Sequence, residues 1–268
     1  MRLDLKLVEL GLARSRKHAT DLIDADRVLV DSKVARKASL SVGDEIKIEV
    51  LDAIDYVSRA GHKLAKALEA FGEIEVQGKL ALDVGASTGG FTDVLLRKGA
   101  RQVIALDVGH DQLVPELREN SRVVVLEGFN AREMSGETLA VAAGGIDPKT
   151  IELVVADLSF ISLTLVLEAL VKTAPSADFV LLIKPQFEVG KQSLSASGIV
   201  NDWSLRAFAI KQVLNCAFDL GVGVKGLVRS GLPGTHGNIE YVLWISPSAT
   251  INRSQWLASA DSIAKEPK

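Results

Sequence analysis

The chain has 268 residues, of which 47% are hydrophobic and 24% are charged, so it can form one large or two unequal domains around a hydrophobic core. This composition excludes a peptide hormone, an isolated motif and an intrinsically disordered chain. The 31 basic and 34 acidic side chains give a net charge of −3, which argues against a polybasic protein but leaves local basic patches open.

Cysteine and histidine usage indicates the compartment and the kind of chemistry. A single cysteine cannot form an intramolecular disulfide, and residues 1–9 contain no apolar stretch of the signal-peptide type, so we expect a cytoplasmic protein. The most apolar long segment, residues 151–171, contains three carboxylates, so we expect no membrane span. The four histidines lack partners at ligand spacing, so we expect no metal site, and a monomer is the default oligomeric state.

The first fifty residues predict a small α+β unit. Ala19, Leu22 and Ile23 fall on one face of a helix that opens near Ser15, and a looser helical pattern precedes it. Short strands are expected at residues 28–30, 33–34 and 44–50. Residues 11–37 contain seven basic and four acidic side chains, so this unit has a local positive excess although the whole chain is negative.

Four short motifs characterise this unit: Arg2-Leu3-Asp4, Gly11-Leu12-Ala13-Arg14-Ser15-Arg16, Val28-Leu29-Val30 and Val42-Gly43-Asp44-Glu45-Ile46. On these motifs the unit resembles the S4 RNA-binding domain, in which a basic helix face contacts RNA phosphates. The resemblance implies RNA contacts from Arg14, Arg16, Lys17 and Arg27. The alternative, that these cations are a solvated helix start, stays open.

From residue 79 onward, apolar runs alternate with longer helical stretches, which predicts βα units around a mostly parallel sheet. Seven strands are expected, at residues 79–84, 102–107, 122–126, 151–157, 178–184, 223–228 and 239–246, the last two as an antiparallel, hairpin-like edge. Helices are expected at residues 90–98, 111–119, 135–143, 162–173 and 203–220. The predicted organisation is residues 1–50, a linker at 51–57, a large domain at 58–247 and a polar tail at 248–268 that contains at most one weak helix.

A glycine-rich turn, Gly85-Ala86-Ser87-Thr88-Gly89-Gly90, follows the first of these strands and opens a helix. It lacks the Gly-Lys-Ser/Thr of a P-loop and fits the dinucleotide pattern Gly-x-Gly-x-x-Gly poorly. The remaining ligand class is S-adenosylmethionine, with Asp107 at the end of the next strand positioned to bind ribose hydroxyls. A tight turn without a ligand is the alternative. The candidate cofactor contacts are Gly85, Ala86, Ser87, Gly89, Gly90, Phe91 and Asp107, with Phe129 and Asn130 flanking the adenine.

Four blocks then point to one family: the turn block Asp83–Thr92, Ala156-Asp157-Leu158-Ser159-Phe160-Ile161-Ser162-Leu163, Leu182-Ile183-Lys184-Pro185-Gln186-Phe187-Glu188-Val189-Gly190 and Gly237-Asn238-Ile239-Glu240-Tyr241. In this order the blocks closely resemble the TlyA family, which joins an S4 domain to an FtsJ-type methyltransferase domain. The resemblance implies a Rossmann-like class I methyltransferase of the α/β class. It also implies S-adenosyl-L-methionine as methyl donor and 2′-O-methylation of cytidine in ribosomal RNA. Older names call such proteins haemolysins.

The same resemblance implies a catalytic set of Lys63, Asp157, Lys184 and Glu240. A ribose 2′-hydroxyl must lose its proton as it attacks, so the reaction needs a base, and we assign that role to Lys184. A neighbouring Lys63 would favour the neutral form of the base and stabilise the developing alkoxide, whereas the two carboxylates would orient the lysines. Taken alone, each lysine is also compatible with an ordinary solvated surface charge.

Further RNA contacts are expected from Arg59, beside Lys63, and from Lys191, in a Gly/Ser-rich loop that could close over the target nucleotide. Two other classes of protein remain alternatives. One is a non-catalytic S4-type protein that binds RNA or the ribosome, and the other is a haemolysin or cytotoxin, for which the sequence offers no amphipathic membrane helix.

Overall fold

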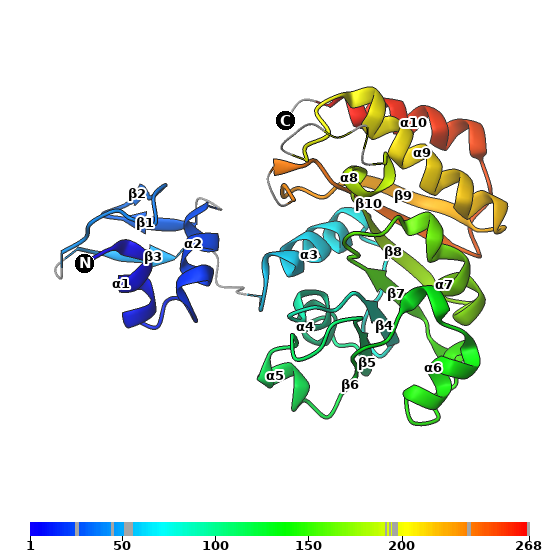
Figure 1. Ribbon diagram of the computed structural model, residues 1–268, viewed down its shortest axis with the longest axis horizontal. Helices are drawn as coiled ribbons and strands as arrows, with labels where there is room; N and C mark the ends of the chain where they lie inside the picture. Colours follow the sequence, from blue (N-terminus) through cyan, green and yellow to red (C-terminus); the bar gives the residue numbers. More distant parts are fainter. Residues whose placement is uncertain are drawn as a thin grey trace. The chain divides into compact units, whose positions relative to one another are not determined.

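The computed structural model describes residues 1–24, 27–43, 46–50, 56–190, 192, 194, 198–234 and 237–266. The chain divides into two compact units, Met1–Arg59 and Ala60–Lys268 (Figure 1). Each unit has its own hydrophobic core. The boundary between the units follows directly on the linker predicted at residues 51–57, of which residues 51–55 lie outside the described part.

The N-terminal unit is a small α+β domain, as predicted. Its elements are α1 (Leu3–Glu9), α2 (Arg16–Asp24), β1 (Val28–Val30), β2 (Lys33–Val34) and β3 (Ile48–Val50). The strands form an antiparallel sheet in the order β2-β1-β3. Ala19, Leu22 and Ile23 of α2 are buried against Leu3 and Leu7 of α1, because apolar residues at this spacing share one helix face. The third strand is shorter than the predicted 44–50, of which residues 44–45 are not described.

The C-terminal unit contains all seven expected strands in one sheet. They are β4 (Leu80–Val84), β5 (Gln102–Leu106), β6 (Val123–Leu126), β7 (Leu153–Ala156), β8 (Asp178–Ile183), β9 (Gly223–Arg229) and β10 (Tyr241–Ser246). Their order in the sheet is β6-β5-β4-β7-β8-β10-β9. The strands β4 to β8 are parallel, and their runs of buried aliphatic residues are typical of strands covered on both faces.

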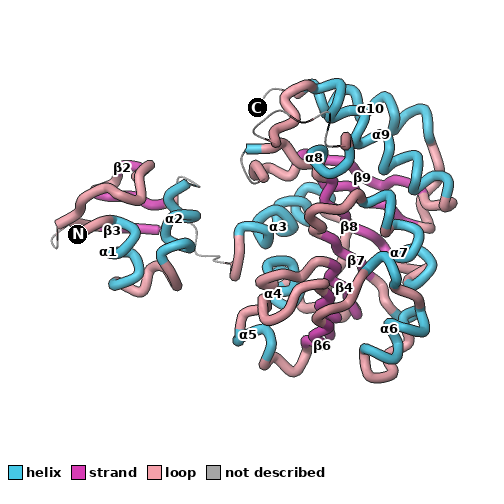
Figure 2. The backbone as a smooth tube through the Cα atoms, in the orientation of Figure 1, coloured by secondary structure: helices cyan, strands magenta, loops and turns pink. Residues whose placement is uncertain are grey.

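Helices cover both faces of this sheet. They are α3 (Arg59–Phe71), α4 (Gly90–Arg97), α5 (Pro115–Arg118), α6 (Gly136–Ala142), α7 (Leu167–Thr173), α8 (Pro185–Glu188), α9 (Trp203–Asp219) and α10 (Arg253–Lys265), with short 3₁₀ turns η1 (Ala131–Glu133), η2 (Pro148–Thr150) and η3 (Leu163–Leu165). Figure 2 shows α3 and α4 on one side of the strands and α6 and α7 on the other. The main core joins the sheet to α6, α7, α9 and α10.

The connectivity creates a crevice at one edge of the sheet. From β4 the chain winds outward through β5 to β6, then returns to place β7 on the other side of β4. In open α/β sheets this change of winding direction leaves room for a ligand at the carboxyl ends of the two central strands. Gly85 and Asp157 are the residues that directly follow β4 and β7.

The last strand runs antiparallel to both of its neighbours. β10 pairs with β8, with Tyr241 opposite Ile183, and with β9 on its other side. The antiparallel pairing of the last two strands is thus confirmed, but only β9 lies at the edge, since β10 is inserted beside β8. Because β10 begins where β8 ends, Glu240 and Lys184 come to the same place on the sheet.

Two segments differ from the predicted pattern. The helix expected at residues 111–119 is reduced to the single turn α5, because Asp111 has a positive φ of 54° and Pro115 occupies the first turn. The expected polar tail, residues 248–268, contains α10, which packs on α9 and buries Ala260 and Ala264 completely. The C-terminal helix is therefore part of the core of the larger unit.

Candidate active site

A cavity of about 470 Å³ lies at the carboxyl ends of β4, β5 and β7. Its size is within the range of small-molecule sites. Six predicted site residues line it: Gly85, Ser87, Asp107, Phe129, Asn130 and Asp157. The remaining lining residues are Leu106, Val108, Gln112, Ala131, Leu158, Ser159, Phe160, Ile161 and Val166.

Gly85 lets the first strand approach the loop after β7. Its φ is +84°, and a Cβ built on it would lie 3.0 Å from the carbonyl oxygen of Asp157 and 3.1 Å from Leu158 Cδ2. A side chain here would be strained both by the backbone conformation and by backbone contact. The glycine that the turn pattern singled out is therefore required by the junction of β4 and β7.

The Asp107 carboxylate holds the glycine turn from the neighbouring strand. Its Oδ2 accepts the backbone N–H of Ser87 and its Oδ1 accepts that of Gly109, both at 2.8 Å. The hydroxyl of Ser87 also donates to Gln112 Oε1 at 3.1 Å. A carboxylate has about four acceptor positions, so Asp107 keeps capacity for hydroxyl donors from a ligand.

A second carboxylate lies beneath the turn. Asp83, at the end of β4, is fully buried and accepts a hydrogen bond from Thr92 Oγ1 at 2.6 Å, while its Oδ1 has no hydrogen-bond partner among the described residues. Burial raises the pKa of Asp83 to about 7; the hydrogen bond from Thr92 opposes this shift, and the charge of Asp157 adds to it.

Lys184 directly follows β8 and reaches the loop after β7. Its Nζ forms an ion pair with Asp157 Oδ1 at 2.6 Å and donates a hydrogen bond to Ser159 Oγ at 2.8 Å. The lysine is 9% exposed, and both of its partners line the cavity.

Lys63 and Glu240 form a second pair. Lys63, on α3, donates to Glu240 Oε2 at 2.5 Å, and Gln186 Nε2 donates to the other carboxylate oxygen at 3.4 Å. Glu240 is 2% exposed and immediately precedes β10, one residue outside the strand that was predicted to contain it. The structure thus brings the four predicted catalytic residues into two lysine–carboxylate pairs.

The loop after β7 is fastened to the turn after β8. The rings of Phe160 and Phe187 lie 5.3 Å apart, and the carboxylate of Glu188 accepts the N–H of Leu163 at 2.9 Å and the hydroxyl of Ser162. Burial raises the pKa of Glu188, while these two hydrogen bonds oppose the rise. These contacts hold the cavity wall against the segment that carries Lys184.

The other predicted cofactor residues are buried or have hydrogen-bond partners within the protein. Ala86, Gly89, Gly90 and Phe91 are buried. Asn130 lines the cavity, but its Oδ1 accepts the N–H of Arg132 and its Nδ2 donates to Glu133, so its amide also caps η1. Ser159, Phe160, Gln112 and Glu188 had no role assigned from the sequence. The only signal for the first two was their position in the block around Asp157.

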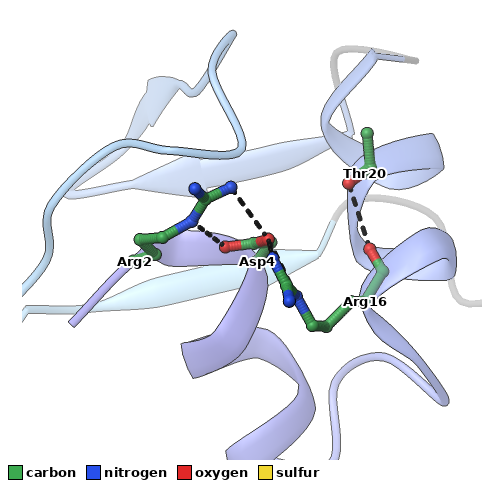
Figure 3. Close-up of polar contacts among 4 residues, drawn as sticks. All are labelled: Arg2, Asp4, Arg16 and Thr20. Atoms are coloured by element: carbon green, nitrogen blue, oxygen red, sulfur yellow. Dashed lines mark hydrogen bonds and ion pairs between the residues drawn. The ribbon is translucent and has the colours of Figure 1, made fainter.

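In the N-terminal unit, one of the predicted RNA-binding arginines has an internal partner. Figure 3 shows the Asp4 carboxylate between the guanidinium groups of Arg2 and Arg16. Arg16 Nη2 lies 3.1 Å from Asp4 Oδ2, and Arg2 Nε lies 2.9 Å from Oδ1. The hydrogen bond from Arg2, assisted by that from Arg16, lowers the pKa of Asp4 although burial opposes this. Arg16 therefore joins α1 to α2.

The other predicted RNA-binding residues differ from Arg16 in their partners and in their positions along the chain. Lys17 is exposed and forms no ion pair with any residue in the described ranges. Arg14 donates to the carbonyl of Tyr56 at 2.8 Å, which ties the segment before α3 to the N-terminal unit. Arg59 begins α3 and Arg27 precedes β1. The prediction for Lys191 lies outside the described residues.

The cavity fits S-adenosylmethionine in volume and in chemistry. Two carboxylates, Asp107 and Asp157, line the cavity, and their negative charge suits a ligand with a sulfonium and an ammonium group. Asp107 offers free acceptor positions. Among the described residues there is no cluster of three metal-ligating side chains, and no described helix is long and apolar enough to cross a membrane.

The fold and cavity define a class I S-adenosylmethionine-dependent methyltransferase, joined to a small N-terminal domain. The FtsJ-like methyltransferase family matches residues 56–246, and the S4 domain family matches residues 1–46. The chain belongs to the TlyA family of FtsJ-like methyltransferases that carry an S4 domain. The predicted resemblance, fold class and methyl donor are thereby confirmed.

The relatives carry two kinds of name. The chain is 49% identical over 247 residues to the 16S/23S rRNA (cytidine-2'-O)-methyltransferase TlyA of Mycobacterium tuberculosis (strain ATCC 25618 / H37Rv), with 91% of this chain and 89% of the relative covered. It is 43% identical to Hemolysin A of Brachyspira hyodysenteriae, with 90% and 98% covered. A solved putative hemolysin from Streptococcus thermophilus matches at 34% identity and a TM-score of 0.74, with 98% and 94% covered.

Proposed function

We propose that the protein methylates the 2′-hydroxyl of cytidine in ribosomal RNA, with Lys184 as the general base. The observation that carries the proposal is the position of the Lys184 amine beside two residues that line the cavity, Asp157 and Ser159. When bound, S-adenosylmethionine supplies a methyl group whose bond to sulfur breaks with the electron pair left on sulfur, so the leaving group takes no proton. The protein must therefore supply a base and needs no acid.

In this proposal the proton of the 2′-hydroxyl passes to Lys184 Nζ. A lysine can accept it only in the neutral form, and the contacts with Asp157 and Ser159 hold the nitrogen in place for the transfer. The developing oxyanion needs a positive or hydrogen-bonding neighbour, and Lys63, held by Glu240, is the candidate. Asp157 and Glu240 thus orient one lysine each.

RNA binding is assigned to two parts of the chain. The S4 domain would contact RNA phosphates through Arg14, Arg16, Lys17 and Arg27, and Arg59 and Lys191 would contribute near the target nucleotide. At the cavity itself, Phe160 is 92% exposed and offers an aromatic face beside Lys184 on which an unstacked base could lie. An rRNA substrate places this activity at the ribosome, in the cytoplasm.

The test is methyl transfer from labelled S-adenosylmethionine to isolated 30S and 50S subunits from a strain that lacks the gene. We expect incorporation into one or both subunits and a 2′-O-methylcytidine in the digested rRNA, mapped by mass spectrometry. Modification at a base, or at a ribose other than that of cytidine, would contradict the proposed substrate.

The same experiment separates the other classes of function. Tight binding to subunits without any incorporation would indicate a non-catalytic RNA-binding protein. Lysis of erythrocytes by the pure protein, again without incorporation, would indicate a haemolysin. Methyl incorporation by the wild-type protein, with none by the Lys184→Met variant, would support the assignment of Lys184 as the base.

A further inference from the structure

Ser159 is the residue that receives a directed hydrogen bond from Lys184. Its Oγ lies 2.8 Å from Nζ and accepts the N–H. Asp157 Oδ1 is slightly closer, at 2.6 Å, but it accepts no aligned hydrogen bond. A charge attracts the ammonium from any direction, whereas a hydrogen bond requires the N–H to point at its acceptor. Asp157 therefore sets where the nitrogen lies, and Ser159 sets how it is rotated.

The loop that carries Ser159 is fixed at both ends. At its start, Asp157 N–H donates to the carbonyl of Val84 at 3.2 Å. At its end, the N–H of Leu163 donates to Glu188, which lies one helical turn after Lys184. Between these points the Phe160 ring packs on Phe187. Ser159 is exposed, but its position relative to Lys184 is determined by these contacts.

We propose that Ser159 is a positioning residue for the general base. A neutral amine has two N–H groups and one lone pair. If Ser159 holds one N–H and the Asp157 carboxylate attracts the other, the lone pair takes the one remaining direction, where it can accept the proton of the 2′-hydroxyl. The inference deepens the proposed function and rests on it, because it assigns to Ser159 the alignment of the proton transfer to Lys184.

Ser159 also lines the cavity, so a simpler role must be distinguished from this one. A serine that only contacts the methyl donor would change the KM for S-adenosylmethionine. A serine that aligns the base would change kcat and the pH dependence of kcat. If Ser159 only stabilised the loop, Ser159→Ala would leave the pH dependence of kcat unchanged. Ser159→Thr would then lose as much activity as Ser159→Ala.

The experiment compares wild type, Ser159→Ala and Ser159→Thr on 30S and 50S subunits at saturating RNA. We expect Ser159→Ala to lower the plateau value of kcat by about tenfold, a part of the total effect of a general base. Its KM for S-adenosylmethionine should stay within about twofold of wild type, because the change affects proton transfer and not ground-state binding. Ser159→Thr keeps the hydroxyl and should restore most of kcat.

The pH profile gives the second readout. The ammonium form of Lys184 loses an acceptor in Ser159→Ala, so the pH at which kcat reaches half of its plateau should move to a lower value. Ser259→Ala is the control, since Ser259 lies on α10, away from the cavity lining, and its hydroxyl donates to the carbonyl of Gln255. It should leave this midpoint where wild type has it.

Three outcomes would overturn the inference while leaving the proposed function intact. They are a wild-type kcat in Ser159→Ala, a raised KM for S-adenosylmethionine with kcat unchanged, and equal losses in the Ala and Thr variants with an unmoved pH midpoint. If the wild-type protein methylates neither subunit, the proposed function fails first. Circular dichroism of each variant confirms that the folded protein is being compared.

Discussion

The two lysine–carboxylate pairs lie at the same edge of the sheet but differ in the contacts that their lysines and carboxylates make. Lys63 donates directly to Glu240, which is 2% exposed and also accepts from Gln186. Lys184 divides its contacts between Asp157 and Ser159, both on the cavity wall. Among the described residues that line the cavity, the partners of Lys184 occur, whereas Glu240, the partner of Lys63, does not.

This difference assigns the two lysines different roles: Lys63 stabilises the site, whereas Lys184 can react. A buried pair whose members satisfy each other is expensive to break, since removal of one partner leaves the other charge without compensation. A lysine whose partners lie on the cavity wall can exchange contacts when a substrate arrives, and its protonation can change during a reaction. The comparison therefore predicts different consequences for the same substitution in the two pairs.

Substitution of Lys184 should give the largest effect on activity. We expect Lys184→Met to lower kcat by about 10³-fold, within the range that general-base catalysis contributes, while the protein still binds S-adenosylmethionine. Isothermal titration calorimetry measures binding, and single-turnover transfer to ribosomal subunits measures the chemical step. A Lys184→Met variant with wild-type kcat would remove the functional distinction between the pairs.

Substitution of Lys63, whose carboxylate partner is the more deeply buried of the two, should act first on stability. Lys63→Met leaves the Glu240 carboxylate buried without its cation, and we expect the free energy of unfolding to fall by about 3–5 kcal/mol. The double variant Lys63→Met/Glu240→Gln removes both charges and should recover most of this loss. Urea unfolding followed by circular dichroism measures both. If the double variant were no more stable than Lys63→Met, the pair would not be the cause.

Asp83 extends the comparison to a buried carboxylate whose only side-chain partner among the described residues is Thr92. Because its pKa is raised from 3.8 to about 7, the folded protein holds this proton more tightly than the unfolded chain. Its contribution to stability is full below about pH 4 and is lost as the pH rises through 7. The loss amounts to about 4 kcal/mol.

Asp83→Asn should flatten this pH dependence, since the amide does not ionise. We expect the variant to gain stability relative to wild type between pH 5 and pH 8, measured as the shift in the urea midpoint. Parallel curves for the two proteins across this range would mean that Asp83 is already ionised in the folded state at pH 5.

The smallest effect concerns the S4 domain, where Arg16 pairs with Asp4 and its neighbour Lys17 forms no ion pair with a described residue. Lys17→Ala should weaken rRNA binding and reduce the slope of log Kd against log salt by about one, without a change in stability. Arg16→Ala should also destabilise the domain, because Arg16 pairs with the buried Asp4. Fluorescence anisotropy with an rRNA fragment, together with thermal melting, separates the two. Equal effects of both variants on melting would contradict this assignment.

The sequence predicted the large features of the fold because buried parallel strands appear as continuous apolar runs. All seven strands of the sheet were located in this way. Helix α10 was less visible, since the residues it buries completely, Ala260 and Ala264, carry little hydrophobic signal. The termination of the predicted helix at 111–119 depends on the backbone of Asp111, which local pattern does not specify.

The part of the candidate site that lies at the ends of strands could be predicted from the sequence. Asp157 and Lys184 directly follow neighbouring parallel strands, so their proximity follows from topology. The partnership of Lys63 with Glu240 joins residues 177 positions apart and depends on the insertion of β10 beside β8. Ser159 gave no periodic signal, because it is an exposed polar residue whose importance comes only from its contact with Lys184.

The most direct test of Lys184 as the base is the pH dependence of a single turnover on isolated subunits with saturating S-adenosylmethionine. For wild type, the logarithm of the rate should rise with a slope of about one and reach a plateau as the lysine loses its proton. The Lys184→Met variant should lack this rise and remain about 10³-fold below the plateau. A wild-type rate that is independent of pH, or a variant that keeps the wild-type profile, would contradict the account.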